Sequence, residues 1–363
     1  MKAVDLFAGA GGATQGLRDA GFDVVAAVEL DPDAAATWSL NHPGKMLVKD
    51  VREVTGPMLM AAGGFKRGEL DLLKACPPCQ GFSSLRGAST PDESRNDLVL
   101  DTLRLVRSLR PRAVLIENVP GLRKDGRFVQ LAAGIRQLGY NLQDYLVNAH
   151  ELGVPQRRKR LVVIAVRGVE VPSGLDELIP GVERRAAMTA GEALAALPQV
   201  EGEPGLLDAP RRRNATVMLR IAAVPVGGNR FALPLSLQLE CHKRLTGKDG
   251  KAARIATSSY GRVVNENPAP TMTTRCTTPA CGSFIHPTEN RGITLREAAA
   301  FQTFPASYQW SGTYGSVERQ IGNAVPVWMA ESLGRAVGRL LGYQAQVMLR
   351  TRAEHRREHA AER

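Results

Sequence analysis

Two cysteines separated by two prolines, Cys76 and Cys79, form the segment with the clearest capacity for chemistry. A Cys-x-x-Cys pair can be half of a zinc site, but no second pair has suitable spacing, because four residues separate Cys276 from Cys281. The pair could also be a redox dithiol. Zinc deaminases carry Pro-Cys-x-x-Cys with an upstream His-x-Glu, and this sequence has neither the proline before Cys76 nor a His-x-Glu.

A single thiol at Cys79 would permit a different reaction, methylation of a cytosine ring. Carbon 5 of cytosine is too weak a nucleophile to take a methyl group unaided. A thiolate that adds to carbon 6 turns the ring into an enamine, whose carbon 5 can attack a sulfonium methyl group. A free thiol has a pKa of about 8.5, so nearby positive charge would favour the thiolate.

An acid and a basic run follow two later apolar segments and could complete such a site. Glu117 ends the strand predicted at Ala113–Ile116, where an acid is often only a cap. In this chemistry, however, an acid beside cytosine N3 is required, because protonating N3 removes the charge created by attack on carbon 6. In extended chain, Gln156, Arg158 and Arg160 share one face and Arg157 and Lys159 the other, so one face can line a site.

A glycine-rich turn, Asp5-Leu6-Phe7-Ala8-Gly9-Ala10-Gly11-Gly12, lies between the first predicted strand and the first predicted helix. Such a turn lets backbone and helix N–H groups approach a ligand. Glu29 and Asp50 end the next two predicted strands, where carboxylates can meet ribose hydroxyls and an adenine amino group. A dinucleotide-binding turn would need a third glycine at the position of Thr14, which disfavours that alternative.

The elements that must position these residues alternate between strands and helices. This alternation predicts an α/β fold with a parallel sheet covered by helices on both faces. Strands are expected at Lys2–Phe7, Phe22–Glu29, Lys45–Val48, Leu70–Ala75, Ala113–Ile116 and Leu161–Val166. Helices are expected at Gly11–Ala20, Pro32–Asn41, Asp97–Arg110, Thr294–Thr303 and Pro326–Leu341.

The texture of the sequence changes near residue 168, where Pro, Gly and Arg become frequent and helical periodicity fades. We therefore predict a catalytic and cofactor-binding domain of residues 1–168 plus 318–345, a smaller, irregular domain of residues 169–317, and a charged tail of residues 346–363. The net charge of +11 and the pI of about 9.7 favour a polyanionic partner. Five cysteines, no membrane-length apolar segment and no signal-like start predict a cytoplasmic protein without disulfides.

Taken together, the motifs resemble those of the DNA cytosine-5 methyltransferase family, in the usual order and over about 320 residues. Besides the glycine-rich turn, the matches are Pro78-Cys79-Gln80, Glu117-Asn118-Val119, Gln156-x-Arg158-x-Arg160, Arg291…Leu295-Arg296-Glu297-Ala298…Phe301-Gln302-x-Phe304-Pro305 and Gln320-Ile321-Gly322-Asn323-Ala324-Val325-Pro326. Leu295-Arg296-Glu297 lacks the proline often found before that arginine.

The resemblance implies a Rossmann-like, S-adenosylmethionine-dependent catalytic domain, with a target-recognition domain in the irregular region. It implies that Cys79 is the nucleophile, that Glu117 contacts N3, and that Arg158 and Arg160 support a base flipped out of double-stranded DNA. The implied DNA contacts are Gln80, Ser83 and Arg95. The implied cofactor contacts are Phe7, Ala8, Gly9, Gly11, Gly12, Glu29, Leu30, Asp50, Val51, Pro78, Asn323 and Val325.

A compact chain of this kind is typical of a bacterial enzyme of restriction-modification or orphan type. The expected protein is a monomer without a metal, associated with the nucleoid, and a cognate restriction endonuclease would act on the same site. Three rivals stay open: a transfer-RNA cytosine methyltransferase of the same fold, a catalytically silent DNA-binding protein, and a nicotinamide-type dehydrogenase.

Overall fold

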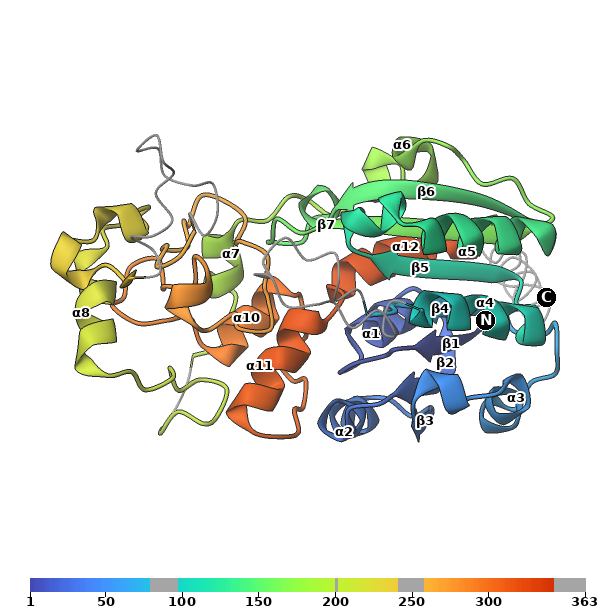
Figure 1. The fold of residues 1–363 in the computed structure, drawn as a ribbon, viewed down its shortest axis with the longest axis horizontal. Coiled ribbons are helices and arrows are strands. Elements are labelled where there is room, and N and C mark those ends of the chain that lie inside the picture. The colour runs from blue at the N-terminus through green and yellow to red at the C-terminus, as the bar shows by residue number, and fades with distance from the viewer. Residues whose placement is uncertain (79–96, 200–201, 241–257, 343–363) are drawn as a thin grey trace, which may run out of the picture.

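A computed structural model describes residues 1–78, 97–199, 202–240 and 258–342 of the chain. The molecule has two parts side by side, a sheet flanked by helices and a more irregular part made mainly of short helices and loops (Figure 1). The fold is the predicted α/β class with a smaller irregular region. The predicted tail at 346–363 lies outside the described residues.

The sheet has seven strands in the order β3-β2-β1-β4-β5-β7-β6. Strands β1 to β5 are parallel to one another, as predicted. The prediction of an all-parallel sheet is wrong for β7, which runs antiparallel to both β5 and β6. The bounds are β1 Lys2–Leu6, β2 Asp23–Glu29, β3 Lys45–Val48, β4 Leu72–Ala75, β5 Ala113–Asn118, β6 Tyr140–Asn148 and β7 Lys159–Arg167.

The reversed direction of β7 has a physical cause in the length of its connection. Only ten residues separate the end of β6 from the start of β7, whereas a parallel crossover needs a dozen or more. The reversal matters for the site, because the start of an antiparallel strand meets the carboxyl ends of its parallel neighbours. Arg158 and Arg160 therefore lie at the edge of the sheet where Glu117 lies.

Helices cover both faces of the sheet and bury its alternating apolar side chains. One face packs against α3 (Gly56–Gly63), α4 (Leu98–Leu109) and α5 (Gly126–Gln137). The other packs against α1 (Gly12–Asp19), α2 (Pro32–Asn41) and α12 (Val327–Leu340). The predicted helices near 11–20, 32–41, 97–110 and 326–341 are confirmed, whereas α3 and α5 were not predicted.

The irregular part, residues 188–323, contains α7 (Ala190–Ala195), α8 (Ala215–Ala223), α10 (Leu295–Phe301) and α11 (Tyr314–Asn323). Of these, only α10 was predicted. With little regular structure, its backbone carbonyls need other donors. The buried Arg262 guanidinium supplies four of these bonds, to the carbonyls of Ile221, Val224, His286 and Glu289. A charged side chain thus holds together a region whose described residues form no sheet.

The chain returns from the irregular part to the sheet through α12, which packs against α1. The approach is close, because a Cβ at Gly16 would lie 2.2 Å from the Val327 carbonyl oxygen. This contact brings Asn323 and Val325 back to the glycine-rich turn. The predicted domain boundary at residue 318 falls inside α11, and residues 171–179 pack in the core of the sheet. None of the described helices is long and apolar enough to cross a membrane.

Candidate active site

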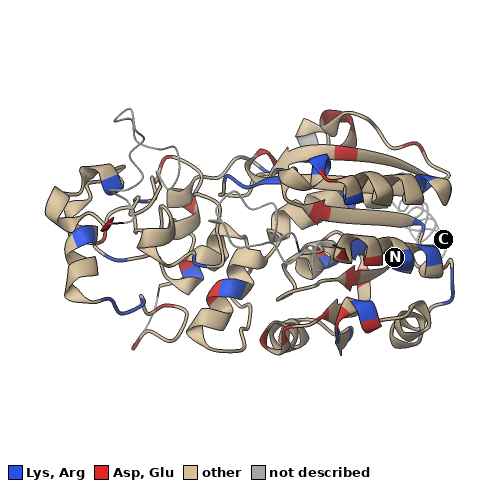
Figure 2. Cartoon of the chain, viewed as in Figure 1, with Lys and Arg blue, Asp and Glu red and all other residues tan. Residues whose placement is uncertain are grey.

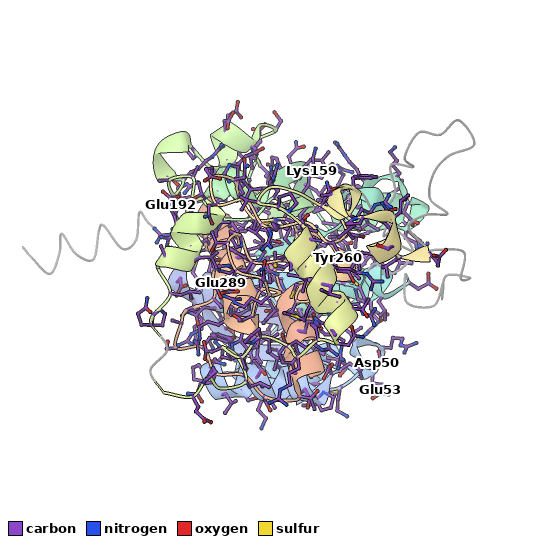
Figure 3. The ribbon with its side chains drawn as sticks, turned by 90° about the vertical axis from the view of Figure 1, so that its left-hand side faces the viewer. Asp50, Glu53, Lys159, Glu192, Tyr260 and Glu289 are labelled. Atoms are coloured by element: carbon purple, nitrogen blue, oxygen red, sulfur yellow. The ribbon has the colours of Figure 1, made fainter. Side chains whose placement is uncertain are left out.

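A cavity of about 850 Å³ opens at the carboxyl edge of the parallel strands. Thirteen predicted site residues line it: Phe7, Ala8, Gly9, Glu29, Leu30, Asp50, Val51, Pro78, Glu117, Arg158, Arg160, Asn323 and Val325. Cys79, Gln80, Ser83 and Arg95 lie outside the described residues. Seen from the side of the irregular part, Lys159 at the start of β7 and Asp50 after β3 lie far apart across this edge (Figure 3).

Gly11 and Gly12 belong to the turn but are not among the residues that line the cavity. Gly11 has a φ of 92°, and a Cβ there would lie 2.5 Å from His42 Nε2. A Cβ at Gly12 would lie 2.6 Å from the Val325 carbonyl oxygen. Both glycines therefore allow residues distant in sequence to pack closely against the turn, a role that the sequence pattern does not reveal.

The Glu29 carboxylate fixes two segments that line the cavity, the glycine-rich turn and the residues just after β2. Its Oε2 accepts from the Gly9 N–H at 2.7 Å, and its Oε1 accepts from the N–H groups of Leu30 and Asp31, each at 2.8 Å. Burial raises the pKa of Glu29, although these backbone bonds oppose the shift. A carboxylate with two lone pairs on each oxygen can still accept from a ligand hydroxyl.

Asp50 and Phe7 take up distinct positions at the same cavity. The Asp50 carboxylate pairs with Arg52 (Nη2–Oδ2, 2.5 Å), and this partner lowers the pKa of Asp50. Phe7 has a φ of 56°, in the left-handed region that a bulky residue rarely adopts. Such strain is common where the surrounding fold imposes a side-chain direction, and Phe7 is directed to the cavity.

Glu117 lies at the end of β5, and only 8% of it is exposed. Arg160 Nε is 2.8 Å from its Oε1, which forms a buried ion pair. The Cys76 thiol donates to its Oε2 at 3.4 Å. The next residue, Asn118, donates to the Pro77 carbonyl oxygen at 3.0 Å, which ties the cysteine loop to β5.

The basic run before β7 divides between the two faces as predicted. Gln156 and Arg158 are buried and Arg160 is half-buried, whereas Arg157 and Lys159 are exposed. Their tasks differ, because Arg158 donates to the carbonyl oxygens of Met272 (3.0 Å) and Gly322 (3.4 Å) in the irregular part. Burial, then repulsion from Arg160, lowers the pKa of Arg158.

Sequence reasoning missed a buried lysine beside this site. Lys74 in β4 makes an ion pair with Asp5 in β1, with Nζ 2.8 Å from Oδ1. The other oxygen of Asp5 accepts from Thr14 Oγ1, which in turn accepts from Trp38 Nε1. The available signal was a lysine within the apolar run Leu70–Ala75, because a charge in a buried strand needs a partner.

A second missed contact supports the glycine-rich turn from the irregular part. Tyr308 Oη donates to the Ala10 carbonyl oxygen (2.6 Å) and lies 2.9 Å from His42 Nε2. Because the tyrosine proton is committed to Ala10, His42 must donate from Nε2 and accept from Arg18 at Nδ1. Protonating Nδ1 would set two donors against each other. Burial, then Arg18, lowers the pKa of His42 to about 4.

This geometry predicts an acid-sensitive contribution to stability. A histidine whose folded pKa lies below its unfolded value stabilises the fold fully above pH 6.5 and progressively less as the pH falls toward 4. For His42 the loss should reach about 3 kcal/mol. Urea unfolding of the wild type and His42→Gln at several pH values measures it. We expect the wild type to lose more stability than the variant below pH 6, and parallel curves would contradict the assignment.

Comparison with known proteins places this cavity in a family. A family model described as C-5 cytosine-specific DNA methylase matches residues 1–339. The chain is 33% identical over 350 residues to the Type II methylase M.HgiDII of Herpetosiphon aurantiacus. This match covers 93% of this chain and 95% of that protein. It is 33% identical over 355 residues to the Type II methyltransferase M.PspPI of Psychrobacter sp. (strain TA137), covering 93% and 79%.

Solved structures agree with this result. A DNA modification methyltransferase encoded within an E. coli prophage has a TM-score of 0.68 and 26% identity, covering 94% of this chain and 99% of that one. The S. pombe Dnmt2 methyltransferase shares the fold, with a TM-score of 0.60 and 19% identity over 95% of this chain. The fold is thus Rossmann-like. The chain belongs to the C-5 cytosine-specific DNA methylase family and is a methyltransferase of that class.

Proposed function

We propose that the protein transfers a methyl group from S-adenosylmethionine to carbon 5 of cytosine within a specific sequence of double-stranded DNA, through a covalent bond between Cys79 and cytosine carbon 6. The observation that carries this proposal is Glu117 at the cavity edge, paired with Arg160 and tied through Asn118 to the loop that leads to Cys79. Family membership supports the same reaction.

The carboxylates and the aromatic ring that line the cavity suit the ribose and adenine of the cofactor. Glu29 stands where the second parallel strand ends, with lone pairs available to ribose hydroxyls, and Asp50 stands where the third ends. Phe7 offers a ring for the adenine, and Asn323 and Val325 also line the cavity. The described part of the chain holds no cluster of three His, Cys, Asp or Glu side chains suited to a metal ion.

In the proposed reaction, Cys79 thiolate adds to carbon 6 of a base flipped out of the duplex. Glu117 holds a proton at N3, which neutralises the charge created by this attack. Arg160 keeps the Glu117 carboxyl in place, and Arg158 supports the same wall. When bound, S-adenosylmethionine would supply the electrophilic methyl group that carbon 5 attacks, with S-adenosylhomocysteine as the leaving group. A base, water or a site group, then removes the proton from carbon 5, the electron pair of that C–H bond expels the Cys79 thiolate, and the N3 proton returns to Glu117 as the ring is restored.

The irregular part is the proposed target-recognition domain, and residues Gln80, Ser83 and Arg95 are proposed to contact DNA. Lys and Arg occur on both parts of the molecule (Figure 2), which suits a polyanion held between them. Because the relatives are Type II enzymes, the proposal includes a bacterial restriction-modification role in the cytoplasm, as a monomer, beside an endonuclease for the same site.

Bisulfite sequencing tests this function directly. Plasmid DNA is recovered from a host that lacks cytosine methylation and expresses the protein, beside an empty-vector control. We expect protected cytosines at one fixed position within one short motif. Unprotected DNA from cells that contain soluble protein able to bind S-adenosylmethionine would refute the DNA substrate and direct the same assay to RNA.

A further inference from the structure

Lys74 breaks the pattern of the strand that holds it. The other residues of β4 are apolar and buried, and the lysine side chain is 3% exposed on the face covered by α1 and α12. The sheet register sets it directly beside Asp5, its ion-pair partner. A buried pair of this kind contributes little to stability by itself. Departures from the usual sequence pattern, such as a buried charge in an apolar strand, are most common at functional sites. The groups around Lys74 therefore indicate which part of the site the ion pair holds.

The polar chain continues from Lys74 toward the active site. Residues two apart on a strand share a face, so Cys76 follows Lys74 on the same side of the sheet. The Lys74 ammonium and the Cys76 sulfur lie near each other on that side and interact electrostatically. Because Ala75 pairs with Ile116, the next positions, Cys76 and Glu117, come beside each other, and the Cys76 thiol donates to Glu117 Oε2 at 3.4 Å.

The two oxygens of Glu117 are therefore held by different elements. Oε1 faces Arg160 of β7, and Oε2 faces Cys76 after β4. We propose that Cys76, anchored through Lys74 to Asp5, is a positioning residue that fixes the plane of the Glu117 carboxyl against the target base. This inference rests on the proposed role of Glu117 at N3. It gives the first cysteine of the loop a task separate from that of Cys79.

The state of the thiol agrees with a donor. Burial raises the pKa of Cys76, and the neighbouring carboxylates of Glu117 and Asp5 oppose the lowering effect of Lys74. The group thus keeps its proton and donates S–H to Glu117, with the Lys74 ammonium nearby. A thiol held in this form is a poor nucleophile, so the geometry favours support over attack.

The far end of the chain is also fixed. Asp5 Oδ2 accepts from Thr14 Oγ1 of α1 at 2.7 Å, and Thr14 Oγ1 accepts from Trp38 Nε1 of α2 at 2.8 Å. All of these groups are buried. A chain of contacts through Cys76 and Lys74 thus connects the Glu117 carboxyl to α1 and α2, which lie behind the cavity. The exact position of this carboxyl matters, because misplacement of a reacting group by about 1 Å can slow catalysis by about a hundredfold.

Single-turnover methylation rates of Cys76 variants test the proposal. Cys76→Ser keeps a donor of similar size and should remain within about threefold of the wild type. Cys76→Ala and Cys76→Val remove the donor and should each slow transfer by about three- to tenfold, with KM for DNA and for cofactor unchanged. Either apolar variant suffices if the other does not fold. Equal rates for serine and both apolar variants, whether fast or slow, would overturn the proposal.

A double-mutant cycle separates positioning from a general packing effect, because Cys76 also packs against the apolar cluster of Ala13, Val325 and Ala330. If Cys76 acts through Glu117, adding Cys76→Ala to Glu117→Gln should slow transfer by less than about twofold. A full multiplicative loss would overturn the proposal. A wild type that methylates no cytosine would instead refute the proposed function, so the two failures are distinguishable.

Discussion

Replacing Cys79 with alanine should reduce methyl transfer by at least about a thousandfold, because it removes the proposed nucleophile, whose addition to carbon 6 would activate carbon 5. Cofactor binding should be unchanged, since the proposed cofactor cavity is lined by residues of the turn, β2 and the segment before α12. Rates follow from tritium transfer to a DNA fragment that contains the motif found by bisulfite sequencing. Cofactor affinity follows from calorimetry on the same preparation.

Cys76→Ala is the matched control, because it deletes a thiol from the same loop. It should keep at least about a tenth of the wild-type rate, since Cys76 only holds Glu117. Equal and complete loss from both variants would point to a pair that acts together, as in a redox or metal site. That result would contradict Cys79 as a lone nucleophile.

The sequence was sufficient to predict the parallel strands and the edge at which the site forms. Glu29 and Glu117 each follow an apolar run, and the carboxyl ends of parallel strands meet at one edge of the sheet, so both acids were expected at that edge. The same reasoning could not orient β7, because an apolar run such as Leu161–Val166 reads equally well in either direction. The direction of β7 depends on its short connection from β6, and the polar residues within β6 obscured that strand in the sequence.

The sequence identified candidate residues for the site, but not the contacts that those residues make. Arg158 and Arg160 share a face as expected, but whether a guanidinium meets a carboxylate or backbone carbonyls depends on segments far away in sequence. Arg158 bonds to Met272 and Gly322, more than a hundred residues later. Gly11 likewise admits Tyr308 and His42, a contact that no local pattern encodes. Long-range packing supplied what spacing and residue type could not.

Glu117→Gln should slow methyl transfer by about a hundredfold to ten-thousandfold, the usual range for loss of a positioned acid. The amide has the shape of the carboxyl, so its two neighbours, Arg160 and Cys76, can remain in contact. It cannot hold an exchangeable proton at cytosine N3 and lacks the charge that pairs with Arg160. The loss should therefore appear in the chemical step, with cofactor affinity within about threefold of the wild type.

Asp144→Asn, in β6, provides the control for that measurement. Asp144 also pairs with an arginine, Arg123 (2.8 Å), but neither residue lines the cavity. Asp144 is half-buried and its partner Arg123 is exposed, and the pair lies away from the cavity, so Asp144→Asn should methylate at the wild-type rate. If Glu117→Gln matched this control, Glu117 would have no part in the reaction and the Arg160 pair would be structural alone. A large loss confined to Glu117→Gln would instead tie catalysis to the carboxyl that β4, β5 and β7 jointly hold.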